Sequence, residues 1–290
     1  MRHAENEPSA RDRLPPAPGP LPVDGAPATR IIGCCGWSVS GNVQAEFPGP
    51  GSHLQRYARR YAGVEISSSF YRHHQHATYA RWAASVPSGF RFAVKLPRGV
   101  THERRLAGTM PEIADFLAET AGLGTARGPL LIQLPPSLAF QGRTVVRFLE
   151  GLRRRYAGEL VCEPRHPTWF TGPVAAVLAD FQVARVAADP ARVPEAALPG
   201  GWPGLRYYRL HGSPLLYRSA YDETYLEALA RALCAERTPA WCIFDNTMVQ
   251  AAQRNALSLG ERLNGFIPTL AKGPPGQAPG DGALPPAAAR

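Results

Sequence analysis

Lysine is almost absent from this chain: of its 32 basic residues only Lys95 and Lys272 are lysines, and the rest are arginines. Because nearly every cation is an arginine, a lysine at the end of an apolar run indicates a place where the compact ammonium group is needed. The pKa of an ammonium falls readily on burial, so Lys95 is suited to act as a base, a Schiff-base nucleophile or a point-charge contact to an anion. The alternative is a purely structural ion pair between Lys95 and Glu65.

Patterns typical of several other protein classes are also missing. The five cysteines include no C-x-x-C pair, and no H-E-x-x-H motif occurs, which argues against a zinc ribbon, a disulfide framework and a zincin-type metal site. No stretch approaches 18 uninterrupted apolar residues, so no membrane span is expected. The N-terminal sequence MRHAENEPSARDR lacks the apolar segment of a signal peptide. We therefore expect a cytoplasmic protein without a membrane partner.

Both ends of the chain are poor in periodic apolar residues. Residues 1–30 contain seven prolines, and residues 268–290 are rich in proline, glycine and alanine. Such segments bury too little apolar surface to offset the entropy lost on ordering. We expect disordered tails over 1–30 and 268–290 and a single folded domain over 31–267.

The folded part is strongly basic. The formal net charge is +9, and residues 31–267 contribute +8 of it. A basic domain favours an anionic small molecule or nucleic acid as partner, through electrostatic steering and counterion release. The alternative is that the arginines are spread over solvated helix surfaces.

Eight short apolar runs alternate with helix-length stretches, which is typical of βαβ units and a parallel sheet. Eight such units in about 240 residues match a (β/α)8 barrel, in which active sites lie at the carboxyl ends of the strands. The predicted class is α/β, a TIM-barrel-like single domain. The runs are Ile31–Cys35, Val64–Ser67, Arg91–Lys95, Leu130–Leu134, Leu160–Glu163, Ala184–Asp189, Arg206–Gly212 and Ala240–Asn246. Spacings of 3.6 residues predict helices over 53–62, 78–86, 110–123, 144–156, 174–181, 225–234 and 250–263.

Acids, bases and hydrogen-bonding groups stand where these strands end. Crowded carboxylates raise one another's pKa, which lets an acid and a base coexist at neutral pH. Arg209 and His211, two residues apart, point to the same side of a strand, as suits an arginine that holds an anion while a histidine moves a proton. With His211 the carboxylates also form the donor set of a divalent-metal site. The alternative is a metal-free salt-bridge network that only neutralises charge. The strand-end residues are Glu65, Lys95, Gln133, Glu163 with Arg165, Asp189, Arg209 with His211, and Asn246.

Several segments resemble the DUF72 (YecE/YunF-like) family. They run in order from Ile31 to Gly265 and read IGCCGWS, VEISSSFYR, FRFAVKLPRGVTH, LLIQLPPSL, CEPRHPTW, YRLHG and FDNT…AQRNA. The resemblance implies a TIM-barrel-like fold and no established reaction. It adds His102 and His166 to the polar positions above. It also implies a fold comparison with endonuclease IV and sugar-isomerase barrels, which is analogy and does not fix function.

These features predict an enzyme performing acid/base or metal-assisted chemistry on an anionic, phosphate-containing substrate, as a hydrolase or a lyase/isomerase. The expected catalytic residues are Glu65, Lys95, Glu163, Asp189 and His211. The expected substrate-binding residues are Arg165, Arg209, Gln133, Asn246, His102, His166, Tyr71 and Trp37, the last two as aromatic rim residues whose alternative role is to pack loops onto the barrel. Two other hypotheses stay open: a nucleic-acid-binding or endonuclease IV-like protein, and a non-catalytic metabolite-binding barrel. No resident cofactor is predicted beyond the divalent-metal alternative.

Overall fold

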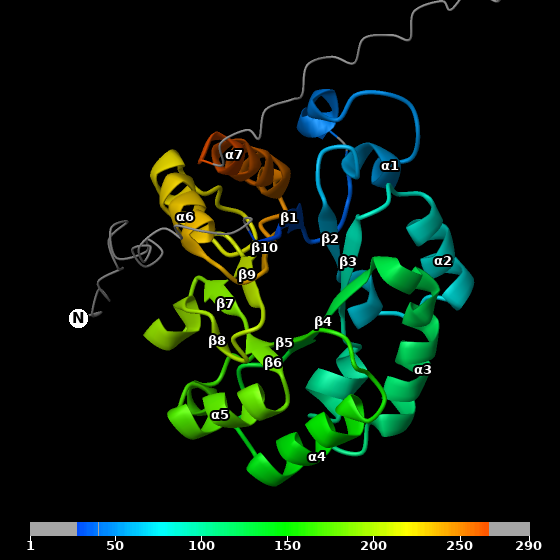
Figure 1. Ribbon diagram of the computed structural model, residues 1–290, viewed down its shortest axis with the longest axis vertical. Coiled ribbons are helices and arrows are strands. Elements are labelled where there is room, and N and C mark those ends of the chain that lie inside the picture. The colour runs from blue at the N-terminus through cyan, green and yellow to red at the C-terminus, as the bar shows by residue number, and fades with distance from the viewer. Residues whose placement is uncertain (1–27, 40, 267–290) are drawn as a thin grey trace, which may run out of the picture.

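A closed ring of parallel strands forms the centre of the molecule in the computed structural model, which describes residues 28–39 and 41–266 (Figure 1). Its strands are β1 (Arg30–Cys34), β2 (Gly63–Ile66), β3 (Arg91–Lys95), β4 (Arg127–Gln133), β5 (Leu160–Glu163), β6 (Val183–Arg185), β7 (Ala187–Asp189), β9 (Arg206–Leu210) and β10 (Ala240–Phe244). The short β8 (Gly200–Gly201) pairs antiparallel with β6. The expected tails lie for the most part outside the described residues, and Arg30 already belongs to β1.

Two hydrogen-bonded sheets make up this ring. One has the order β2-β3-β4-β5-β6-β8 and the other β1-β10-β9-β7. Strands β6 and β7 are two halves of one strand, separated only by Val186, whose N–H donates to the Cys162 carbonyl at 2.9 Å. On the opposite side β1 meets β2 through a parallel bridge between Cys35 and Glu65. With β6 and β7 taken together the ring has eight strands, and the predicted (β/α)8 barrel is confirmed.

Helices surround the barrel (Figure 1). They are α1 (His53–Tyr57), α2 (His76–Ala84), α3 (Met110–Thr120), α4 (Gly142–Arg153), α5 (Gly172–Asp180), α6 (Glu223–Ala235) and α7 (Ala251–Phe266). Shorter 3-10 turns cover Gly41–Glu46, Ser68–Phe70, Ala121–Ala126, Pro167–Trp169 and Pro194–Ala197, and a π-helical turn covers Gly99–Glu103. Side-chain caps fix two of the helix starts: Ser52 and Gln55 form a capping box at α1, and Asp222 accepts from the Tyr225 N–H at α6. Helix α1 is shorter than predicted, because Arg59 and Arg60 N–H groups bond to carbonyls only three residues earlier.

Two hydrophobic layers follow from the alternation of side chains along the strands. The outer layer lies between the strands and the helices and holds most of the core. The inner layer fills the barrel, where the rings of Tyr207 and Trp241 stack with centroids 6.0 Å apart. Close approach requires glycine beside this stack, since a Cβ at Gly128 would lie 2.8 Å from the Trp241 ring.

The inner layer determines which residues reach the mouth of the barrel. Ala93, Leu131, Val161, Tyr207 and Ile243 all belong to this layer. Because side chains two positions apart share a face of a strand, the residues two positions further on point to the same interior at the carboxyl ends. These residues are Lys95, Gln133, Glu163, Arg209 and Asp245.

None of the helices in the described ranges is long and apolar enough to cross a membrane.

Candidate functional site

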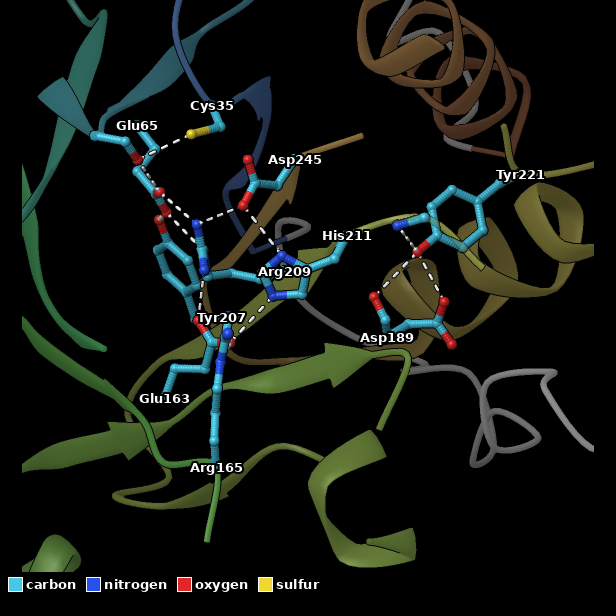
Figure 2. A network of polar contacts seen from close by, with 12 residues as sticks. Cys35, Glu65, Glu163, Arg165, Asp189, Tyr207, Arg209, His211, Tyr221 and Asp245 are labelled. Carbon is cyan, nitrogen blue, oxygen red and sulfur yellow. Dashed lines mark hydrogen bonds and ion pairs between the residues drawn. The ribbon is translucent and has the colours of Figure 1, made fainter. Parts of the chain in front are cut away.

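Arg209 stands at the centre of a buried ion network at the carboxyl mouth of the barrel (Figure 2). Only 1% of this residue is exposed. Its Nε and Nη2 donate to Glu65 Oε2 and Oε1 at 3.0 and 2.8 Å, a bidentate contact. Its Nη1 donates to Glu163 Oε2 at 2.5 Å, and Nη2 also donates to Asp245 Oδ2 at 3.0 Å. One guanidinium therefore joins strand ends from three parts of the barrel.

Glu65 is held by four donors. Besides Arg209, Ser67 Oγ donates to Oε1 at 2.8 Å and the Tyr207 hydroxyl donates to Oε2 at 3.0 Å. Cys35 Sγ in turn donates to Ser67 Oγ at 2.9 Å. Both carboxylate oxygens are thus fully engaged, and Glu65 acts as the anchor of Arg209.

His211 bridges two carboxylates of the same network. Its Nε2 lies 3.1 Å from Glu163 Oε1 and its Nδ1 lies 3.0 Å from Asp245 Oδ2. Each nitrogen needs a hydrogen to bond an ionised carboxylate, so this geometry calls for the imidazolium. Burial opposes that charge, but the Glu163 carboxylate and the hydrogen bonds to Asp245 and Glu163 outweigh it and hold the pKa of His211 above its usual 6.5.

With His211 protonated, the network is electrically balanced. Arg165 donates to Glu163 Oε1 through Nε and Nη2 at 3.0 and 2.9 Å. Burial disfavours the charged form of Glu163, yet the neighbouring cations hold its pKa well below 4.5, and the pKa of Asp245 is lowered for the same reason. Three carboxylates therefore face three cations: Glu65, Glu163 and Asp245 against Arg165, Arg209 and His211.

Lys95 lies beside this balanced network without joining it. Its Nζ sits 3.9 Å from the centroid of the Phe70 ring, and none of the ion pairs within 4 Å among the described residues involves Lys95. The structural ion pair with Glu65 is therefore not formed. Burial lowers the pKa of Lys95, and the nearby Arg209 charge lowers it further.

His102 shares the Phe70 ring with Lys95. It lies in the π-helical turn, its ring centroid 4.9 Å from that of Phe70, and its Nδ1 is 2.9 Å from Thr101 Oγ1. Burial and the charges of Lys95, Arg165 and Arg98 lower the pKa of His102 to about 4. The imidazole is consequently neutral near pH 7, in a region of positive potential.

Sulfate should raise the pKa of His102. This dianion keeps its charge through the titration range and would offset the positive charges that depress the pKa. Imidazole NMR titrations in chloride and in sulfate, at equal ionic strength, measure the effect. We expect a shift of about one unit or more, equivalent to about 1.4 kcal/mol of interaction. The exposed His73 is the internal control, and equal shifts at His73 and His102 would show that sulfate does not act locally at His102.

Two expected site residues lie outside the network. In the register of β7 with β9, Ala188 pairs with the inward Arg209, so Asp189 faces outward. There it accepts a 2.7 Å hydrogen bond from the Tyr221 hydroxyl (Figure 2). Asn246 also faces outward, one position after Asp245, and donates to the Ser219 carbonyl and to Asn255 Oδ1 at 2.9 Å each. Both residues fasten loops rather than line the mouth.

The other expected residues occupy different parts of the mouth and rim. Gln133 is buried and donates through Nε2 to the Leu134 carbonyl at 3.0 Å. His166 caps the Pro167–Trp169 turn, where its Nδ1 accepts from the Thr168 N–H. Tyr71 is 77% exposed, and Trp37 packs edge-to-face on Trp82 with centroids 5.0 Å apart. Trp37 thus serves loop packing while remaining half-buried.

Asp245, Tyr207 and Cys35 take part in the network and were not predicted from the sequence. The two-residue spacing from the apolar Ile243 to Asp245 could have found the aspartate, since it repeats the spacing from Val161 to Glu163. The same spacing places Tyr207, two positions before Arg209, on the inner face and Tyr208 on the outer one, but it does not show that the Tyr207 hydroxyl reaches Glu65.

The contacts do not fit the divalent-metal alternative. Glu65 and Glu163 direct their oxygens at arginines and hydroxyl groups, and both nitrogens of His211 face carboxylates. Over residues 28–39 and 41–266, no group of three or more His, Cys, Asp or Glu side chains is arranged to hold a metal ion. The acids and the histidine at this mouth are therefore bonded to other protein groups and do not form a set of metal ligands.

The fold and the site define a (β/α)8-barrel protein with a buried ion network at its carboxyl mouth. The family model described as "Protein of unknown function DUF72" matches residues 31–278. The chain belongs to the DUF72 family.

Known relatives agree with this assignment. The UPF0759 protein YecE of Escherichia coli (strain K12) is 26% identical over 118 residues, which span 40% of this chain and 43% of that protein. A DUF72 family protein from Thermotoga maritima MSB8 matches with a TM-score of 0.69 and 24% identity, covering 81% of this chain and 99% of the other. A DUF72 family protein from Enterococcus faecalis V583 matches with a TM-score of 0.69 and 21% identity, covering 81% of this chain and 96% of the other. D-psicose 3-epimerase from Clostridium cellulolyticum H10 shares the fold alone. It matches with a TM-score of 0.50 and 9% identity, covering 81% of this chain and 98% of the other.

Proposed function

We propose that the protein is an enzyme that binds an anionic, phosphate-containing small molecule at the carboxyl mouth of the barrel and transfers a proton there. The observation that carries this proposal is Lys95, a largely buried ammonium beside a network whose charges already balance. A buried cation without a counter-ion is costly, and an anionic ligand would compensate it.

Arg165 supplies the second donor for this anion. Its Nε and Nη2 bond to Glu163, which fixes the plane of the guanidinium. Its Nη1 makes no hydrogen bond to the described residues. A preoriented guanidinium beside an ammonium is a combination that binds phosphate groups through charge-assisted hydrogen bonds.

His102 is the group best placed to exchange a proton with the bound molecule. It is neutral near pH 7 because burial, together with the charges of Lys95 and Arg165, lowers its pKa to about 4. A bound anion would raise that pKa toward neutrality, where a general base or acid is most effective. Glu65, Glu163 and His211 then act as positioning residues that hold Arg209 and Arg165, and Asp189 has no role at this mouth. We keep the hydrolase or lyase/isomerase class, and a cytoplasmic location, as part of the proposal.

Phosphate affinity tests the anion site. We expect Lys95→Gln to weaken binding of inorganic phosphate at least about tenfold, because a hydrogen bond to a charged group contributes about 1.5–3 kcal/mol. Lys95→Arg should retain part of the affinity. Isothermal titration calorimetry measures both, and Arg147→Gln on the exposed side of α4 is the matched control. Equal affinity in Lys95→Gln and the unaltered protein would refute the proposal.

The two other hypotheses give different results. A non-catalytic barrel would bind a phosphorylated compound and leave it unchanged in a 31P NMR time course. For a nucleic-acid partner the support is the +8 of residues 31–267. Such binding would be tighter than that of an unrelated protein of equal charge and would fall steeply with salt.

A further inference from the structure

A groove of about 1010 Å³ adjoins the mouth of the barrel. It lies between the segments that follow β1, β2 and β10, and helices α1 and α2 contribute to its walls. Its size corresponds to that of small-molecule sites. The described residues that line it include no aspartate or glutamate. The groove therefore has no negative charge of its own.

Two glutamines that line the groove have buried amide oxygens without a hydrogen-bond donor among the described residues. Gln253 is 4% exposed and donates through Nε2 to the Ser38 carbonyl at 2.9 Å, which fixes the amide. Its Oε1 is buried and receives no hydrogen bond from the described residues, and the same holds for Gln250 Oε1. Buried acceptors are ordinarily satisfied. Two of them in one groove call for a ligand that brings hydrogen-bond donors, such as hydroxyl groups.

Two arginines give the groove its charge. Arg72 and Arg81 line it, both are exposed, and neither belongs to an ion pair among the described residues. Trp37 and Trp82, packed edge-to-face, form part of the wall. Since no lining carboxylate neutralises the arginines, the groove favours an anionic group.

The groove is continuous with the ion network. Cys35 and Ser67 line the groove, while the Ser67 hydroxyl donates to Glu65 Oε1 in the network. The same segment continues to Phe70, whose ring covers the Lys95 ammonium. A molecule seated in the groove therefore reaches the edge of the ion network at Cys35 and Ser67.

We propose that the substrate is a polyhydroxylated compound with an anionic group at each end. One anionic group binds at Lys95 and Arg165, the hydroxyl groups donate to Gln250 and Gln253, and the second anionic group binds at Arg72 and Arg81. This inference rests on the proposed function for its first anion and extends it with a substrate class and a second binding region.

Fructose 1,6-bisphosphate, fructose 6-phosphate and inorganic phosphate are the probes, with affinities measured by calorimetry. We expect the bisphosphate to bind at least about tenfold more tightly than the monophosphate, as an added charge-assisted contact predicts. Arg72→Gln/Arg81→Gln should remove that difference, with Arg143→Gln/Arg147→Gln on α4 as the matched control. Gln253→Met should remove the advantage of fructose 6-phosphate over inorganic phosphate. Tryptophan fluorescence should change with the sugar phosphates and not with phosphate, and the change should vanish in Trp37→Phe/Trp82→Phe.

The outcomes separate the two proposals. Equal affinities for the two sugar phosphates, both lost in Lys95→Gln, would leave the proposed function standing and overturn the groove inference. Bisphosphate binding that depends on Arg72 and Arg81 but not on Lys95 would support the groove and overturn the proposed anion site. Absence of binding by all three probes would overturn both.

Discussion

Replacing Arg209 with methionine is expected to lower the free energy of unfolding by about 3–5 kcal/mol, the usual cost of removing one partner from a buried ion pair. The physical reason is that Glu65, Glu163 and Asp245 would be left close together inside the barrel without their shared cation. Urea denaturation measures the change. Arg209→Lys should recover part of the loss, since an ammonium restores the charge but not the bidentate contact with Glu65.

Arg206→Gln is the control for this experiment. Arg206 pairs with Glu236 at 3.3 Å near the surface, and both side chains are about a quarter exposed. Such a partly solvated pair should cost no more than about 1 kcal/mol. If Arg209→Met were no more destabilising than Arg206→Gln, the network would not hold the strand ends together.

Glu163→Gln is expected to be nearly as damaging, with a loss of about 3 kcal/mol or more, because Arg165, Arg209 and His211 would all lose the carboxylate they share. The substitution preserves the size of the side chain, so the loss reports on charge and not on packing. Chemical denaturation near pH 6 measures it, with Glu103→Gln as the control, because the Glu103 ion pair with Arg98 is exposed to solvent on both sides.

The same substitution should change how stability depends on pH. The folded-state pKa of His211 lies above its unfolded value near 6.5, so its contribution is fully present below that value and is lost as the pH rises through the folded pKa. Glu163→Gln removes the main group that raises this pKa. The decline in stability above neutral pH that His211 causes should therefore weaken in the variant. An unchanged slope between pH 6.5 and 9 would show that Glu163 does not control the charge of His211.

The barrel and much of the network could be predicted because strand alternation is a local property. The spacings Ala93 to Lys95, Val161 to Glu163 and Tyr207 to Arg209 repeat it at strand ends. Asp189 and Asn246 show where this reasoning fails. Each is a polar residue at the end of an apolar run, but the side it faces depends on the register with a neighbouring strand, which only the folded structure sets.

The pairing of charges could not be predicted in the same way. Arg209 contacts Glu65 across 144 positions of sequence and Asp245 across 36. The sequence identified acids and bases at the mouth. It did not indicate that three carboxylates would form ion pairs with one arginine. It therefore could not distinguish Lys95 and His102, which remain outside that arrangement, from Glu65 and His211, which are part of it.

The stacked Tyr207 and Trp241 rings limit where a ligand can enter and leave the barrel. Together with Ile31, Leu131, Val161 and Ile243 they fill the barrel interior behind the ion network, so within residues 28–39 and 41–266 the site opens at the carboxyl ends of the strands. A ligand therefore enters and leaves through this mouth, and a polymer cannot pass through the barrel. A long chain could present only an end or a flipped-out unit, and products would compete with incoming substrate for one passage.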